Sequence, residues 1–98
     1  MAASTSKKHD NFVREPMLPA GRPKSVDELP GIGPKAKGEL AERGFEHAHQ
    51  LLGQLLIFDR DQDLFLAFLK DSIPCLNWNP KHYTACYNCL NEWCCLNL

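Results

Sequence analysis

Residues 29–37 read Leu-Pro-Gly-Ile-Gly-Pro-Lys-Ala-Lys, and this stretch decides the fold. Ile32 lies between two glycines, Gly31 and Gly33, and Pro34 follows them. Glycine permits a tight bend of the backbone, and proline suits the first turn of a helix. The stretch therefore predicts a hairpin at residues 31–33 and a helix that begins at Pro34.

The flanking residues extend this hairpin into a larger unit. Upstream, Ser25-Val-Asp-Glu28 has the Ser-x-x-Glu form of a capping box, which predicts a short helix from Ser25 to about Leu29. Downstream, Gly44 suits the left-handed position after a helix, so the second helix should end near it. Residues 25–44 are thus predicted to form a helix-hairpin-helix unit.

The hairpin has the composition of a phosphate-binding site. Glycines let a ligand approach the backbone closely, and the first amides of a helix lack partners within that helix. The helix dipole favours an anion there, and Lys35 and Lys37 add positive charge. Because nothing in this arrangement reads bases, we expect it to bind the backbone of duplex DNA without sequence preference, while Ile32 fastens the hairpin to the core. The alternative is a plain turn between two helices.

Length and charge limit the classes of function. A chain of 98 residues forms one small domain, and 11 basic against 12 acidic side chains give a formal charge of −1. That balance argues against a protein that coats nucleic acid by bulk charge, so any DNA contact must be local. Residues 1–8 are small and polar, and no apolar run approaches the length that spans a bilayer. We expect a soluble intracellular protein that does not insert into membranes.

The rest of the chain is predicted to be helical. We expect a flexible leader over residues 1–5 and further helices from Ser6 to Glu15, from about Glu46 to Phe58, from Asp59 or Asp61 to Ile73, and from Pro80 onward. Gly53, in the middle of one of them, suggests close packing there. No alternation of period two appears, so residues 1–98 are predicted to form a single all-α domain, a small helical bundle.

Four of the five cysteines lie close together, at Cys86, Cys89, Cys94 and Cys95. Without a secretory signal we expect reduced thiols. Together with His82, the first three of them have ligand types that a zinc site would accept. However, Cys86 falls at helical intervals with apolar neighbours, which favours cysteines that act as small buried residues. We therefore predict no metal and no cofactor.

The chain also carries more large apolar side chains than one small globule can readily cover. They include Phe45, Phe58, Phe65, Phe68, Trp78 and Trp93. Burial against a second copy would solve this, and a homodimer with two such hairpins could hold two duplexes, or two places on one duplex. The alternative is a monomer with an apolar surface.

With these elements placed, the chain resembles the barrier-to-autointegration factor family of animal chromatin proteins, nearly from end to end. The matching blocks are ordinary singly, but their order and spacing are specific. They are Lys8-His9-x-x-Phe12-Val13-x-Glu15-Pro16-Met17, Leu29-x-Gly31-Ile32-Gly33, Arg43-Gly44-Phe45, Leu52-Gly53-Gln54, Asp61-x-Asp63-Leu64-Phe65, Leu69-Lys70-Asp71 and Cys86-x-x-Cys89-Leu90-x-Glu92-Trp93-Cys94.

The resemblance implies a helical homodimer that binds double-stranded DNA without sequence preference, bridges and compacts it, and is not an enzyme. It also implies two kinds of protein partner, the LEM-domain proteins of the inner nuclear membrane and lamin. These would place the protein in the nucleus, at chromatin and the nuclear envelope, with the cytoplasm as a further location. Vaccinia-related kinases phosphorylate the family near the N-terminus and thereby release DNA, and Thr5 and Ser6 occupy the matching positions.

Carried over residue by residue, the resemblance implies three sites. The DNA-binding residues are Lys8, Gly31, Ile32, Gly33, Lys35, Ala36, Lys37 and Lys81. The LEM-partner groove consists of Phe45, Leu52, Ile57 and Leu64, and the dimer contact includes Gly53 and Phe68. A simpler interpretation stays open for several of them, since Lys81 can be a solvated charge and Leu52 or Leu64 an ordinary core residue.

Two residues depart from the family pattern. Gly38 and Glu39 stand where the family carries a pair of lysines, and a glutamate facing a phosphate would repel it. The departure favours a divergent member or paralogue. It leaves a second hypothesis, a dimeric adaptor that keeps the groove, binds DNA weakly and forms heterodimers with an ordinary family member. Catalysis is disfavoured, partly because His47 and His49, two residues apart, should point to different faces of a helix.

Overall fold

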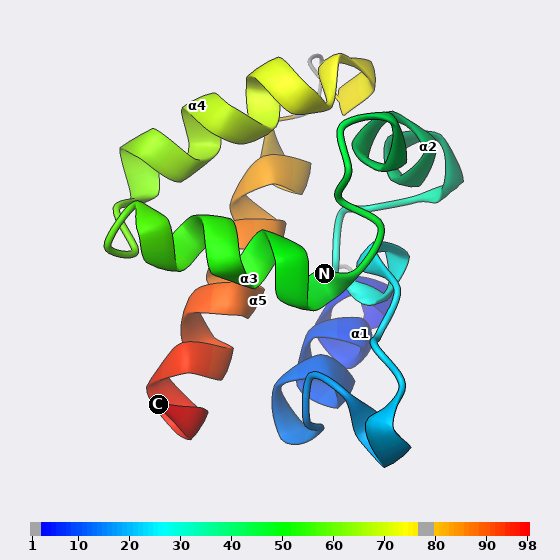
Figure 1. The fold of residues 1–98 in the computed structure, drawn as a ribbon, viewed down its shortest axis with the longest axis vertical. Helices are drawn as coiled ribbons and strands as arrows, with labels where there is room; N and C mark the ends of the chain where they lie inside the picture. The colour runs from blue at the N-terminus through cyan, green and yellow to red at the C-terminus, as the bar shows by residue number, and fades with distance from the viewer. Residues whose placement is uncertain (1–2, 77–79) are drawn as a thin grey trace.

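The computed structural model describes residues 3–76 and 80–98, with side chains from Lys8 onward, and it is built of helices (Figure 1). The α-helices are α1 (Ala3–Arg14), α2 (Pro34–Glu42), α3 (Ala48–Ile57), α4 (Gln62–Ser72) and α5 (Lys81–Asn97). Short 3-10 helices form η1 (Pro19–Gly21), η2 (Val26–Glu28) and η3 (Pro74–Leu76). Apart from one isolated bridge between Ser25 and His47, the described residues form no β-structure, so the predicted all-α fold is confirmed.

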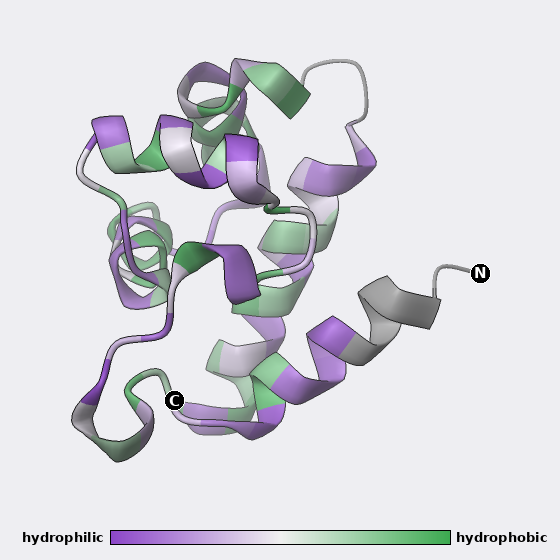
Figure 2. Cartoon of the chain, turned by 90° about the vertical axis from the view of Figure 1, so that its right-hand side faces the viewer, coloured by the Kyte–Doolittle hydropathy of each residue, from purple (hydrophilic) through white to green (hydrophobic). Residues whose placement is uncertain are grey.

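Helix α5 links the two halves of the molecule, since it packs against both α1 and α4 (Figure 1). Helices α2 and α3 both pack on η2. Each α-helix mixes hydrophobic and hydrophilic residues along its length (Figure 2), as helices with one buried face do. The largest fully buried side chains of the resulting core are Tyr83, Phe12, Phe65, Leu29, Ile32, Leu40, Leu51, Leu55, Leu69, Ile73, Leu90 and Val26.

Local signals in the sequence set most of the helix ends. Pro34 begins α2, and Gly44 follows that helix with a φ of +90°. At the start of α4, the Asp61 carboxylate accepts the backbone N–H three residues ahead at 3.0 Å. The capping box at Ser25 is half formed: Glu28 accepts the Ser25 N–H at 3.3 Å, whereas the Ser25 hydroxyl has no partner among the described residues. The short helix expected there is the 3-10 turn η2.

Two expectations about local structure are wrong. Helix α1 begins at Ala3 rather than at Ser6, so residues 3–5 belong to a helix and not to a flexible leader. Alanine favours helix, and nothing between Ala3 and Ser6 breaks one.

His47 and His49 do not point to different faces of a helix, because His47 is the N-cap residue before α3 and is not part of the helix. Their rings stack with centroids 5.7 Å apart.

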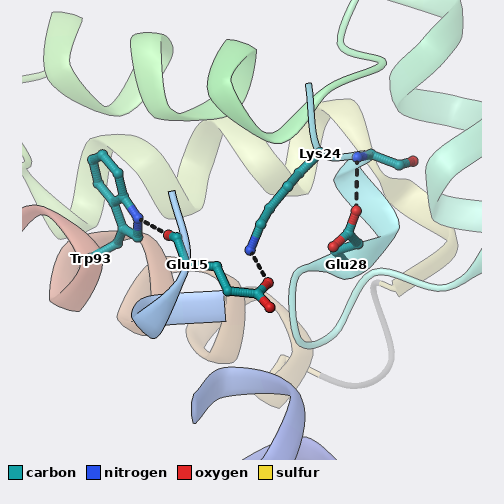
Figure 3. Close-up of polar contacts among 5 residues, drawn as sticks. Glu15, Lys24, Glu28 and Trp93 are labelled. Atoms are coloured by element: carbon teal, nitrogen blue, oxygen red, sulfur yellow. Dashed lines mark hydrogen bonds and ion pairs between the residues drawn. The ribbon is translucent and has the colours of Figure 1, made fainter. Parts of the chain in front are cut away.

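The buried Lys24 connects the loop before the hairpin to the end of α1, and the same residue, Glu15, is also contacted by α5 (Figure 3). The Lys24 side chain is only 2% exposed, and its Nζ lies 2.7 Å from Oε1 of Glu15 and 4.5 Å from the ring centroid of Phe12. The backbone carbonyl of Glu15 accepts the Nε1–H of Trp93 at 2.9 Å. A buried ammonium needs such partners, because leaving it unpaired costs several kcal/mol. This contact joins the ends of α1 and α5 to the segment that enters the hairpin unit.

Replacing Glu15 by alanine should therefore lower the free energy of unfolding by about 1–2 kcal/mol, since the buried ammonium loses its carboxylate. The estimate is at the low end for a buried ion pair because the Glu15 side chain is itself 55% exposed and water can replace part of the contact. Urea unfolding measures the change. Lys24→Met, which removes the ammonium but keeps the apolar stem, is the control and should cost less; equal stability of Glu15→Ala and the unaltered protein would contradict this account.

Candidate nucleic-acid interface

The hairpin forms a bend that is fastened to the core at its centre and open at its end. Ile32 is 1% exposed, and its N–H donates to the carbonyl of Leu29 at 3.2 Å. Gly33 then adopts an extended conformation as the N-cap residue of α2. The expectation that Ile32 fastens the hairpin to the core is confirmed, because its side chain belongs to the buried cluster.

The two glycines of the hairpin are needed for different reasons. Gly31 has a φ of +86°, and a Cβ built on it would collide with the backbone carbonyl oxygen of His82 in α5. A Cβ on Gly33 would meet no atom of the described residues within 4 Å. Gly31 therefore allows the hairpin to pack against another part of the same chain, whereas the space beside Gly33 is open to a ligand.

The backbone beside that open space offers hydrogen-bond donors. Lys37 N–H donates to the carbonyl of Gly33 at 2.9 Å and so begins the hydrogen-bond ladder of α2. Before it, the N–H groups of Gly33, Lys35 and Ala36 have no acceptor within the part of the chain that the structure describes. Such donors at a helix N-terminus suit an anion with several oxygen atoms. The side chain of Ala36 is buried, so only its amide can contribute.

Lysines surround the hairpin, but they are not equivalent. Nζ of Lys8, in α1, donates to the carbonyl of Ile32 at 3.4 Å and so lies against the hairpin itself. Nζ of Lys37 lies 3.8 Å from Oδ2 of Asp27, and this carboxylate partly offsets the positive charge of the lysine. The side chains of Lys35 and of Lys81, at the start of α5, are exposed. The structure thus brings lysines from α1, α2 and α5 together around one bend.

Sequence reasoning missed the partners of two charged residues. Lys24 lies in the loop before the hairpin, and the neighbouring residues Pro23 and Ser25 give no local signal that its side chain is buried. Glu39 was expected to face a phosphate, yet its Oε1 accepts the backbone N–H of Cys75 at 3.2 Å. Both partners come from distant parts of the chain, so neither could be found from local patterns.

An exposed apolar surface lies over α3 and α4, away from the core. Ile57 is 74% exposed, Leu64 52% and Leu56 42%. The half-buried ring of Phe45, before α3, packs edge-on against Phe68 of α4, with centroids 5.3 Å apart. The structure thus leaves several predicted groove residues accessible, although Trp78, one of the large apolar residues of the sequence, lies outside the described residues.

The surroundings of Leu52 and Gly53 can be described from the structure. Leu52 is only 9% exposed and belongs to the core, which agrees with its simpler interpretation. Gly53 does not mark close packing among the described residues, because a Cβ there would meet none of their atoms within 4 Å. Among the described residues, the space beside Gly53 has room for a side chain.

Comparison with known proteins decides the family. The family model described as barrier to autointegration factor matches residues 3–97. The chain belongs to the barrier-to-autointegration factor family. It is 45% identical over 92 residues to the barrier-to-autointegration factor of Drosophila melanogaster, covering 94% of each chain, and 44% identical over 91 residues to that of Homo sapiens, covering 93% of this chain and 94% of the human one.

Membership of the barrier-to-autointegration factor family gives the class of function. The chain is a DNA-binding chromatin protein of the barrier-to-autointegration factor kind, and the family is not enzymatic. Within the described residues, no helix combines the length and the hydropathy needed to cross a bilayer. No group of three or more His, Cys, Asp or Glu side chains in that part of the chain is placed to hold a metal ion.

The cysteines of this family member behave as small apolar residues where they are buried. Cys86, Cys89 and Cys94 lie in the core, Cys75 is half-buried and Cys95 is exposed. Burial raises the pKa of the Cys86 and Cys94 thiols above their usual value, and that of Cys89 to about 12. The buried thiols are therefore protonated and unreactive near neutral pH.

This burial predicts an order of thiol reactivity and a pH dependence. Iodoacetamide should modify Cys95 first, and Cys86, Cys89 and Cys94 only after unfolding, as mass spectrometry of partly labelled protein would reveal. The Cys89 thiol keeps its proton up to about pH 12 when folded but loses it near pH 9 when unfolded, so stability should fall as pH rises from 9 to 12. Labelling of Cys89 as fast as Cys95 in the native protein would contradict the placement.

Proposed function

We propose that this protein binds double-stranded DNA through its phosphate backbone, without sequence preference, at the hairpin. A phosphate would accept hydrogen bonds from the N–H groups of Gly33, Lys35 and Ala36. Positive charge around it would come from Lys8, Lys35, Lys37 and Lys81. Gly31 and Ile32 would contribute by shaping and fastening the bend. The observation that carries the proposal is the set of amides at the start of α2 that have no acceptor among residues 3–76 and 80–98, next to the open space at Gly33.

The positive charge that would attract DNA comes from a few lysines near the hairpin and not from the net charge of the chain. The chain has a formal charge of −1, so long-range attraction to DNA is weak. Amides and a few lysines act at short range and recognise the phosphate without reading bases. Binding should therefore be modest in its salt dependence, with log K falling by about 0.9 per log unit of salt for each phosphate contact.

Fluorescence anisotropy with two duplexes of unrelated sequence tests the proposal. Equal affinities for both, which fall together as salt rises, are expected. Failure to bind either duplex at low salt would overturn it and would favour the second candidate, an adaptor that pairs with an ordinary family member and binds DNA weakly. Light scattering with and without short duplexes would report subunit number and bridging together.

We further infer a homodimer that bridges duplexes and binds LEM-domain proteins and lamin at the nuclear envelope. The exposed Ile57 and Leu64, the rings of Phe45 and Phe68, and the open space at Gly53 support a partner-binding surface over α3 and α4. The buried Leu52 would act by supporting this groove from the core.

Substitutions at this surface test the groove apart from DNA binding. Ile57→Asp should weaken LEM-domain binding about tenfold or more without lowering stability, because the side chain is already 74% exposed. Gly53→Asp should shift light scattering from dimer to monomer, since a charged side chain would enter the contact. A dimeric Gly53→Asp variant that binds LEM domains normally would contradict this surface.

Phosphorylation near the N-terminus would regulate DNA binding. The side chains of Thr5 and Ser6 lie outside those that the structure describes, but both residues belong to α1, which also carries Lys8. Because Lys8 contacts the hairpin carbonyl of Ile32, phosphates added two and three residues before it would repel a duplex bound there. Phosphomimetic Thr5→Asp and Ser6→Asp variants should lower DNA affinity, with Thr5→Ala and Ser6→Ala as controls.

A further inference from the structure

Glu39 lies in α2, the helix that follows the hairpin, and contacts a segment far from it in sequence. Its Oε1 accepts the backbone N–H of Cys75, in η3, at 3.2 Å. The Glu39 side chain is half-buried by this contact. Its charge is therefore directed at the corner between α4 and α5.

Arg43, the C-cap residue directly after α2, contacts the same corner. Its guanidinium donates to the Asp71 carboxylate and to the Asp71 backbone carbonyl, both at 3.1 Å. That carbonyl belongs to the last turn of α4, where carbonyls lack partners within the helix. Residues four apart share one helix face, so this face of α2 is attached to the end of α4 and to η3 at two points.

The corner is attached in turn to the first turns of α5. The buried Tyr83 hydroxyl donates to the carbonyl of Ile73 at 2.8 Å. Burial, with Cys75 and Glu39 nearby, raises the pKa of Tyr83, so the hydroxyl keeps its proton and remains a donor. Tyr83 is two residues beyond Lys81 in α5. Glu39 is therefore connected to the start of α5 through Cys75, Ile73 and Tyr83.

We infer that Glu39 is a positioning residue, which holds the hairpin helix against the α4–α5 corner so that the hairpin amides and Lys81 can contact one DNA backbone together. The inference rests on the proposed DNA-binding function. The direct packing of Gly31 on the backbone of His82 provides the other connection between the hairpin and α5. Glu39 thus contributes to DNA binding through geometry, in spite of its charge.

Geometry and charge predict opposite results for two variants of Glu39. Glu39→Gln keeps the length and the oxygen acceptor but loses the charge. Glu39→Asp keeps the charge but is one methylene shorter and cannot reach the Cys75 N–H without movement. Glu42→Gln, which removes an exposed acid from the same helix, is the matched control for charge alone.

If Glu39 positions Lys81, Glu39→Asp should lower duplex affinity about fivefold near physiological salt, the factor expected for one lost phosphate contact. The slope of log K against log salt concentration should be smaller by about 0.9 for Glu39→Asp. Glu39→Gln should bind duplex DNA with the same affinity as Glu42→Gln. If Glu39 merely repels DNA, Glu39→Asp should bind like the unaltered protein and Glu39→Gln should gain several-fold over Glu42→Gln. That pattern would overturn the inference.

A double-mutant cycle with Lys81→Ala tests the route of the effect. Lys81→Ala should cost about fivefold alone but little in the Glu39→Asp background, because the contact is already lost there. Additive losses would overturn the inference, since Glu39 would then act elsewhere.

Hydrogen exchange gives a readout that does not depend on DNA. The Cys75 amide should exchange faster in Glu39→Asp than in Glu39→Gln or the unaltered protein, because its acceptor has moved away. Unchanged exchange would show that the contact is absent in solution and would overturn the positioning role. A chain that shows the exchange difference but binds no duplex would instead overturn the proposed function, so the two failures are distinguishable.

Discussion

Replacing Gly31 by alanine is expected to lower the free energy of unfolding by about 2–4 kcal/mol, the largest stability change that the structure predicts for the hairpin. Two effects add. The backbone has a φ of +86°, which strains any residue with a side chain, and the new methyl group would collide with the carbonyl oxygen of His82. The Cβ of residue 31 and the carbonyl oxygen of His82 are both fixed by the backbone, so neither can turn aside as a flexible side chain would. The hairpin must therefore move away from α5. Thermal and urea unfolding measure the loss.

Two glycines of the same chain separate these effects. Gly44 has a φ of +90° but open space around it, so Gly44→Ala should show the backbone strain alone, about 1 kcal/mol. Gly33 has an extended backbone and open space, so Gly33→Ala should change stability by less than about 0.5 kcal/mol. A Gly31→Ala variant no less stable than Gly44→Ala would contradict the contact between the hairpin and α5.

Replacing Gly33 by glutamate should weaken DNA binding by about 25-fold at physiological salt while leaving stability unchanged. The position has room for a side chain, so folding is not affected. The carboxylate would lie beside the amides of Lys35 and Ala36, where it could accept their hydrogen bonds in place of a phosphate and repel the duplex. Loss of the equivalent of two phosphate contacts, at about fivefold each, gives the estimate. Anisotropy titration at several salt concentrations measures it.

Gly38→Glu is the control for added charge. Gly38 is exposed on α2, and a Cβ there meets nothing within 4 Å, so the substitution adds the same charge one turn further from the hairpin. Its loss of affinity should be smaller, because the new carboxylate is not next to the unpartnered amides. Equal losses for both variants would mean that net charge, and not the amide site, governs binding.

Much of the fold could be predicted because its signals are local. Pro34 and Gly44 bound α2, Asp61 caps α4, and the apolar residues of each helix recur at helical spacing. Errors arose where a local pattern was incomplete. Helix α1 extends back to Ala3 because no helix-breaking residue lies between Ala3 and Ser6. The rings of His47 and His49 can stack because α3 begins at Ala48, so that His47 lies before the helix.

The candidate site was only partly predictable, since its residues come from α1, the hairpin and α5. The pattern at the hairpin identified the unpartnered amides, but it treated Gly31 and Gly33 alike. Only the packing of α5 on Gly31 distinguishes the residue that the fold requires from the residue that a ligand can approach. In the same way, the sequence of α2 could not reveal that Glu39 is directed at Cys75, 36 residues away.

By itself, the sequence determined the helices, the hairpin and the family, because caps, breakers, periodicity and the order of motifs depend on neighbours along the chain. The tertiary structure alone decided which side chains those helices bury or expose and which charges they bring together. It buried Lys24 against Glu15, left Gly53 facing open space and directed Glu39 away from the hairpin. The physical reason is that burial and electrostatic partnership depend on distance in space, which packing of the core sets between residues far apart in sequence.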